Sequence, residues 1–455
     1  MPVECLELID LEFDYLETED MLIVVAYAFE PLLLIMEWVH GTSKASKFAS
    51  EDIISNMPKN VITNILDRLP IQDAVRTGIL SRSWRFNWTM LSQLVFDEKL
   101  FRYLQRKEHN QFYKRDLGRL LLHFRGFIAK FVLYIPDRVY HQTDDGFGED
   151  INHWILFLST KGMTEFVFLN TPTMLKLSTH LFSCLELKHL KLHKCQLYYV
   201  PGFHGFPNLL SLDFHKVLFE SCICREFITG CPLLEILRIS NDSLNVSCHH
   251  NGNLKLVEMA KLENLKVLSL SLSTLGHKTI THSDFFQLLG FFPKLEKLDL
   301  NFGLCKLLTE AGASTRFSST LPCLKSIQLD GIDFNNRFMV LYVWDLIKGS
   351  SNLQTLKMKV THLKEDDDVS PPPVGSREID CGIIGKLQLR RVELHSIKDS
   401  EIDVCFIKSL LASSSLLEKM VIHKLYGFDV EEKYTFAKKL LKLHRASPIA
   451  EIDLD

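Results

Sequence analysis

Large apolar residues recur along most of the chain in the pattern L-x-x-L-x-L. Nine clear copies begin at Leu187, Leu209, Leu234, Leu265, Leu295, Leu324, Leu353, Leu389 and Leu417, and two weaker copies begin at Ile128 and Met163. The second and third apolar positions of each copy are two residues apart, so both side chains point to the same face of a short strand. The pattern therefore predicts a series of short strands, each with one buried face.

The spacing of the clear copies, 22 to 36 residues, lies around and above the period of leucine-rich repeats. One such repeat cannot cover its own apolar face, and only stacking against neighbours buries a continuous core. We therefore expect an α/β fold in which residues 99–380 form an irregular leucine-rich-repeat solenoid with a parallel sheet. The leucines themselves are expected to be core and nothing more.

Polar residues occupy the outward positions of these strands and are expected to line the concave wall of the solenoid. Such walls serve as extended binding surfaces, and mixed charge suits a protein partner better than a phosphate polymer. A solvated face without a ligand is the alternative. The predicted substrate-binding residues are His189, Lys191, His193, Asp213, His215 and Arg238.

A different pattern occupies residues 52–97, where apolar residues at spacings of three and four predict short helices. Pro70 ends the first helix, and Ser81 is placed to cap a third helix with Trp84 and Trp88 on one face. About 45 residues lie near the lower limit for an independent core. Part of this apolar surface is therefore expected to meet a partner or the following domain.

These residues resemble the F-box. The opening "D-x-I-S-x-L-P" is present as Asp52, Ile54, Ser55, Met57 and Pro58, and "I-L-x-x-L-P" as Ile65, Leu66, Leu69 and Pro70. The later "D-A-V-R-T-x-x-L-S-x-x-W-R-x-x-W" is matched by Asp73, Ala74, Val75, Arg76, Thr77, Leu80, Ser81, Trp84, Arg85 and Trp88. Met57 in place of Leu, and Lys59-Asn60 in place of an acidic pair, depart from the family pattern.

The resemblance implies that this three-helix unit docks the Skp-family adaptor of a cullin-based ubiquitin ligase. By the same resemblance, the adaptor-binding residues are Met57, Pro58, Ile65, Leu66, Leu69, Ile71, Val75, Leu80 and Trp84.

The C-terminal residues 381–455 combine strand-like copies of the repeat with two helices, one of them capped by Ser400. Alternating Ala450, Ile452 and Leu454 predict a last strand. The stretches "L-L-E-K-M-V-I" at Leu416–Ile422 and "H-R-A-S-P-I-A-E-I" at His444–Ile452 resemble the FBD module of plant F-box proteins. The order F-box, repeats and FBD module is that of plant F-box/FBD/LRR-repeat proteins. We expect it to close the solenoid, because an open end would expose the core.

Residues 1–50 form an extension that the resemblance does not match. Its segment 21–39 has 16 apolar residues out of 19, enough to cross a bilayer. Glu30 near the middle, Glu37 and eight acids upstream oppose insertion. The predicted organisation is this extension, an F-box at 51–98, repeats at 99–380, and an FBD module with terminal cap at 381–455.

Charge, cysteine spacing and the motifs that we did not find limit the classes of protein to which this chain can belong. The first 43 residues carry ten acids and no Lys or Arg, so the rest of a chain with net charge −4 stands at only +6, which disfavours nucleic acid. Eleven cysteines without disulfide-framework spacing predict free thiols in a reducing interior. We found no Gly-rich phosphate loop and no catalytic motif, and the spacing of Cys222, Cys224 and Cys231 is unlike a zinc site.

The sequence thus predicts a non-catalytic subunit, with no cofactor or metal, in the cytoplasm or nucleus. Its F-box binds the Skp-family adaptor, and through it the cullin, while the wall captures a protein substrate for ubiquitination. A non-catalytic scaffold or decoy is one alternative. A small-molecule-dependent receptor is another, and a large apolar pocket at the wall would favour it.

Overall fold

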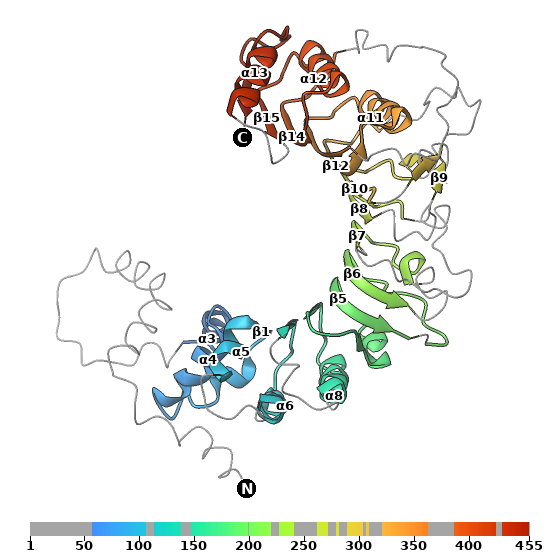
Figure 1. Ribbon diagram of the computed structural model, residues 1–455. Coiled ribbons are helices and arrows are strands. Elements are labelled where there is room, and N and C mark those ends of the chain that lie inside the picture. Colours follow the sequence, from blue (N-terminus) through green and yellow to red (C-terminus); the bar gives the residue numbers. More distant parts are fainter. Residues whose placement is uncertain are drawn as a thin grey trace, which may run out of the picture. The chain divides into compact units, whose positions relative to one another are not determined.

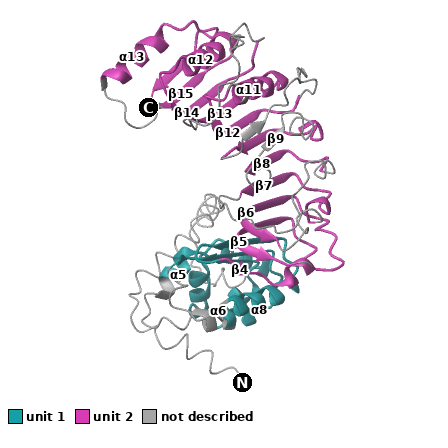
Figure 2. Ribbon diagram, turned by 45° about the vertical axis from the view of Figure 1, so that its right-hand side comes forward, with its two compact units in different colours: residues 1–173 teal, residues 174–455 magenta. Residues whose placement is uncertain are grey.

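The computed structural model describes residues 57–105, 113–137, 147–198, 200–219, 227–240, 262–271, 279–281, 289–303, 306–308, 321–362, 386–424 and 430–454. The chain divides into two compact units, residues 1–173 and 174–455 (Figure 2). The domain bounds predicted from the sequence remain predictions, and the N-terminal extension lies outside the described residues. Within the described residues, no helix is both long enough and apolar enough to span a bilayer.

The first unit begins with short helical elements, shown in blue in Figure 1. Pro58 and Pro70 stand directly before the α-helices α3 (Lys59–Leu66) and α4 (Ile71–Arg76). The third helix predicted from Ser81 does not form. Two 3₁₀ turns, η2 (Thr77–Ile79) and η3 (Asn87–Met90), flank this stretch, and the Ser81 hydroxyl shares a hydrogen bond with that of Ser83 at 2.7 Å.

Tight packing explains these turns. A Cβ added to Gly78 would lie 3.1 Å from the backbone oxygen of Arg85. Gly78 in turn η2 therefore packs directly against the backbone that leads into turn η3. Trp84 and Trp88 are both buried by this arrangement.

Three parallel strands follow within the first unit, in the order β1 (Gln93–Phe96), β2 (Lys130–Ile135) and β3 (Glu165–Asn170). The helices of this part are α5 (Glu98–Gln105), α6 (Tyr113–His123) and α8 (Phe147–Ser159). The sheet packs through aromatic rings: Phe96 meets Phe131 edge-on at 5.4 Å, and Phe131 stacks on Phe166 at 6.0 Å. Strand β1 follows a further L-x-x-L-x-F copy at Leu91, which the sequence reading had left inside the helical segment.

The second unit is a parallel sheet whose main strands stack in chain order (Figure 1). These strands are β5 (His189–Leu197), β6 (Ser211–Phe219), β7 (Ile236–Ser240), β8 (Val267–Ser271), β10 (Lys297–Asn301), β12 (Ser326–Asp333), β13 (Thr355–Thr361), β14 (Arg391–Ile397), β15 (Lys419–Lys424) and β16 (Glu451–Leu454). The short strand β4 (Leu175–Lys176) pairs with β5, and β9 (Thr279–Thr281) pairs with β11 (Lys306–Leu308). The helical connections include η4 (Thr179–Ser183), α11 (Arg337–Gly349), α12 (Glu401–Ser413) and α13 (Val430–Leu441).

The leucine pattern predicted this sheet in detail. At all eleven copies the strand begins two residues after the first apolar residue, as at Leu187 and β5. Both inward positions are buried in ten of the copies, as Leu190 and Leu192 show with exposures of 1% and 0%, and in β7 the second one, Ile239, is half-buried. The expected solenoid-like parallel sheet is therefore confirmed.

Several strands have a residue in the left-handed conformation at the same point. Lys194, Lys216 and Ser396 each have a positive φ, between 53° and 62°, and each follows an outward histidine. Gly331 occupies the corresponding place in β12 with a φ of 79°. The pairing register shifts at this point in β12 and β14, so the bulge turns the end of the strand away from its regular course.

The C-terminal part carries the predicted helices. The Ser400 hydroxyl caps α12 by accepting a hydrogen bond from the backbone N–H of Asp403 at 3.2 Å. Phe436 and Leu440 are buried on α13, whereas Leu441 is 70% exposed. Cys405 is disulfide-bonded, contrary to the expectation of free thiols throughout, and its partner lies outside the described residues.

Candidate functional site

The apolar residues of the F-box divide into a core and a surface. Four of the nine predicted adaptor-binding residues are buried inside the helical unit: Ile65 (9%), Leu66 (0%), Ile71 (4%) and Trp84 (3%). They were expected at the adaptor surface, but a unit this small needs them for its own core. Pro58 and Leu80 are exposed, and Met57, Leu69 and Val75 are half-buried.

Other exposed apolar residues, which the sequence reading did not single out, accompany Leu80. Ile79, Leu80, Phe86 and Met90 are 42%, 41%, 58% and 44% exposed, and we call these four the F-box patch. Turn η2 carries Ile79 and lies against η3, which carries Met90, so the patch gathers on one small region. Apolar side chains grouped in this way mark an interaction surface.

The outward residues of β5, β6 and β7 gather as the sequence predicted. Lys191, Asp213 and Arg238 occupy one row of three adjacent strands, and the Lys191 ammonium lies 3.2 Å from the Asp213 carboxylate. In the next row the imidazoles of His193 and His215 stack, with ring centroids 4.6 Å apart and planes within 8°. We call these five residues the N-terminal wall cluster.

Two neighbours complete the wall cluster at its edges. His189 lies opposite Ser211 in a third row and is exposed. The His215 Nδ1 lies 2.9 Å from the Ser240 hydroxyl on β7. All six predicted substrate-binding residues therefore lie on one face of β5, β6 and β7, although their binding role stays a prediction.

The wall continues to the C-terminal strands with mixed charge. Burial raises the pKa of Asp299 on β10, and the nearby Asp330 carboxylate acts in the same direction. On β13 and β14, the Lys357 ammonium donates a hydrogen bond to Glu393 at 2.9 Å and lowers the pKa of that carboxyl. Acids and bases on this face thus offset one another locally, as suits a surface for a protein rather than for a polyanion.

A separate row of ion pairs lies one residue before the strands. Glu235 pairs with Lys266, and Glu296 pairs with Lys325, each at 2.8 Å. Arg390 pairs with Glu418 at 2.7 Å in the same row. These pairs tie consecutive repeats to each other, so this row serves the stacking of the solenoid.

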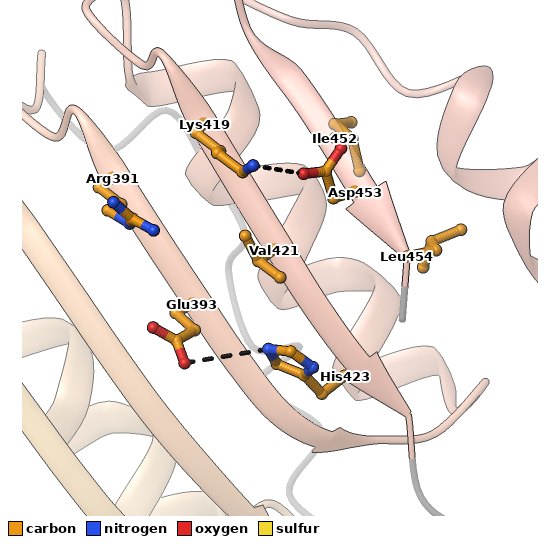
Figure 3. A pocket seen from close by; sticks show the side chains of 8 residues that line it. All are labelled: Arg391, Glu393, Lys419, Val421, His423, Ile452, Asp453 and Leu454. Atoms are coloured by element: carbon orange, nitrogen blue, oxygen red, sulfur yellow. Dashed lines mark ion pairs between the residues drawn. The ribbon is translucent and has the colours of Figure 1, made fainter.

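An open hollow of about 500 Å³ lies on the last three strands (Figure 3). Its lining residues are Arg391, Glu393, Lys419, Val421, His423, Ile452, Asp453 and Leu454. Lys419 pairs with Asp453 at 2.6 Å, and Glu393 and His423 face each other from neighbouring strands. The sequence analysis did not predict a site here, although five of the lining residues stand at outward positions of recognised copies: Arg391, Glu393, Lys419, Val421 and His423.

Comparisons with known proteins find an F-box followed by leucine-rich repeats in this chain. The family model for the F-box domain matches residues 54–95, and that described as "FBD-associated F-box protein At5g56370, LRR repeats" matches residues 151–262. The F-box/FBD/LRR-repeat protein At1g13570 of Arabidopsis thaliana is 31% identical over 423 residues, which are 89% of this chain and 98% of that protein. FBD-associated F-box protein At4g10400 of the same plant is 26% identical over 70% of this chain and 78% of its own length.

Among solved structures, an internalin from Listeria monocytogenes is similar at 12% identity, covering 66% of this chain and 78% of its own. Its TM-score of 0.29 is too low to support an argument.

The fold and the two surfaces define a protein that carries an F-box followed by leucine-rich repeats. The chain belongs to the plant F-box/FBD/LRR-repeat family. Membership supports a general role as a ubiquitin-ligase adaptor, in a family whose members are typically non-catalytic. The F-box implies binding of a Skp-family adaptor, and the repeats imply interaction with protein.

Proposed function

We propose that this protein is the substrate-recognition subunit of an SCF-type ubiquitin ligase. Its F-box patch binds the Skp-family adaptor, the adaptor binds the cullin, and the wall captures a protein substrate. The observation that carries the proposal is the F-box patch itself, because the fold buries Leu66 and Trp84 while Leu80 and Phe86 stay on the surface. A surface of this kind is stabilised when a partner covers it.

The mechanism needs no catalytic side chain in this chain. Holding a substrate near a ligase raises the effective concentration of the reacting groups, and ubiquitin transfer is performed elsewhere in the complex. The N-terminal wall cluster offers ammonium, carboxylate and imidazole groups at strand positions whose backbone is fixed by the sheet. Such a surface favours a partner with both acidic and basic groups.

The hollow on the last three strands bears on the small-molecule alternative. Five of its eight lining residues are charged or histidine, so it lacks the apolar lining that a pre-formed ligand pocket usually has. We therefore favour direct capture of a protein, and we place the complex in the cytoplasm or nucleus.

The test is a reconstituted transfer reaction with the full chain, a Skp-family adaptor, a cullin–RING pair and ubiquitin. Partners are first identified by proximity labelling in cells with degradation blocked, and each is then offered as substrate. We expect ubiquitination of at least one partner to require the F-box patch. A partner that binds the wall but is never modified would instead indicate a scaffold or decoy.

A further inference from the structure

Two histidines and a glutamate converge on the C-terminal part of the wall. Glu393 and His395 stand two residues apart on β14, and His423 lies opposite His395 on β15. The imidazoles of the two histidines stack with centroids 4.3 Å apart and planes within 10°. The His395 Nε2 is 2.6 Å from the Glu393 Oε1, and the His423 Nε2 is 3.9 Å from the same oxygen.

These three residues differ from the other polar groups of the wall. Each of them offers one ligand atom, and these three atoms all lie within 4.8 Å of one another. Among the described residues, this is the cluster of His, Cys, Asp or Glu side chains that is close enough to hold one metal ion. We propose that Glu393, His395 and His423 form a binding site for a divalent transition-metal ion, with Zn²⁺ as the best match.

The donor set fits this ion. Zn²⁺ prefers imidazole nitrogen and carboxylate oxygen at about 2.0–2.2 Å, and two histidines with one glutamate is a donor set known for sites with an open position. Tetrahedral ligands at that distance lie about 3.3–3.5 Å apart. The observed separations of 2.6 Å and 3.9 Å from the Glu393 oxygen bracket this value. Because the two imidazole rings are stacked within 10° of parallel, they must turn relative to each other before both Nε2 atoms point at one ion.

The surroundings of Glu393 support a metal-binding role. Lys357 donates a hydrogen bond at 2.9 Å to the Glu393 Oε1, the same oxygen that both histidine nitrogens approach. The hydrogen bond from Lys357 also orients the carboxylate, as the supporting residues of metal sites do. A metal on Oε1 would displace the Lys357 ammonium from that oxygen, and the second carboxylate oxygen is left to accept its hydrogen bond.

The site opens into the hollow. Glu393 and His423 both line it, and Figure 3 shows the two side chains directed toward each other across β14 and β15. Three protein ligands leave a fourth position for water or for a donor atom of a bound molecule. This inference does not depend on the proposed ubiquitin-ligase role.

The chain contains its own control. His193 and His215 form a second stacked pair on neighbouring strands, and Asp213 precedes His215 by two residues, as Glu393 precedes His395. The Asp213 carboxylate pairs with Lys191, as Glu393 pairs with Lys357, but the His215 Nδ1 lies 2.9 Å from the Ser240 hydroxyl. The two histidine pairs therefore share a geometry, but the three ligand atoms converge at the C-terminal pair.

The experiment titrates Zn²⁺ into the untagged full chain, purified with its adaptor, and measures heat. We expect H423A and E393Q each to weaken the binding of one Zn²⁺ ion at least tenfold. The matched variant H215A is expected to leave the affinity for that ion unchanged. Equal affinity in the wild type, H423A and E393Q would overturn the proposal, as would an equal loss in H215A. E393Q keeps the size of the side chain, and thermal unfolding in metal-free buffer verifies that each variant is folded.

X-ray absorption at the zinc edge supplies an independent readout. We expect a first shell of nitrogen and oxygen that contains two imidazoles. A shell with sulfur would place the metal on cysteines instead and would contradict the assignment.

Discussion

The carboxylate of Asp67, at the end of helix α3, holds the backbone of Ser92 at the start of strand β1. Its Oδ1 accepts a hydrogen bond from the Ser92 N–H at 2.9 Å, and its Oδ2 accepts one from the Ser92 hydroxyl at 2.6 Å. The N–H of Gln93 donates a third at 3.2 Å. These three hydrogen bonds connect helix α3 of the F-box to the first strand of the sheet.

We expect D67A to lower the free energy of unfolding of the first unit by about 1–3 kcal/mol, because it leaves part-buried donors without their acceptor. Urea denaturation followed by fluorescence of Trp84 and Trp88 measures this. The control is E98A, which removes an exposed pair with Arg102. An exposed pair contributes about 0–1 kcal/mol, so equal losses in the two variants would contradict the role given to Asp67.

The left-handed residues of β5 and β6 predict a stabilising substitution. Lys194 and Lys216 occupy the left-handed region, which costs a residue with a Cβ about 1–2 kcal/mol, whereas glycine adopts it freely. We expect K194G and K216G each to raise the free energy of unfolding by about 0.5–1 kcal/mol. K188G, at a residue without a positive φ, gives no gain, and a loss of stability in K194G would show that the left-handed conformation carries no strain.

Cysteine reactivity follows burial. Burial raises the pKa of Cys184 to about 12 and that of Cys231 to about 11, and it raises that of Cys195 further. Because the thiolate is the reactive form, these three are expected to resist alkylation at pH 8, while the exposed Cys323 reacts. Peptide mass spectrometry before and after denaturation checks this. Rapid labelling of Cys195 in the folded chain would contradict the repeat packing.

The wall predicts which charges matter for substrate capture. Reversing Lys191 and Arg238 together should weaken capture at least tenfold and leave adaptor binding unchanged, because the F-box patch is a different surface. The exchange K191D with D213K keeps the local ion pair but inverts its direction. If capture needs the charge pattern, this exchange fails as well. If it restores capture, the pair has only a structural role.

The control for this capture experiment must avoid the row of ion pairs that lies one residue before the strands. Lys188 and Glu235 occupy the same position, one residue before their strands, yet Glu235 pairs with Lys266 on the next repeat. Its reversal would disturb the stacking of the repeats. Lys188 is exposed and has no ion pair with another described residue, so K188E is the appropriate control and should leave capture intact.

The sequence predicted the strands of the sheet because each strand is specified locally. Each strand begins two residues after an apolar residue such as Leu187, and its inward side chains are two residues apart. Strand β1 was missed because Leu91 lies inside a segment dominated by the F-box pattern. The left-handed residues were missed as well, since Lys194 is no more typical of a left-handed conformation than any other lysine.

The surfaces were less predictable, because they depend on contacts between distant residues. Helical spacing shows that Leu66 and Leu80 are apolar, but only the packing of the turns shows that one is core and the other exposed. Likewise, His395 and His423 are 28 residues apart, and the pairing register of β14 with β15 brings them together.

The central claim is that the F-box patch binds the Skp-family adaptor, and one affinity measurement tests it most directly. Full-length chains carrying L80D with F86D, or L122D as a matched control on α6, are titrated with the adaptor by calorimetry. Leu122 is 74% exposed and lies outside the patch. We predict at least a hundredfold loss of affinity for L80D with F86D, since charges at an apolar contact cost several kcal/mol, and unchanged affinity for L122D. Wild-type affinity in the folded L80D with F86D variant, or an equal loss in L122D, would contradict the account.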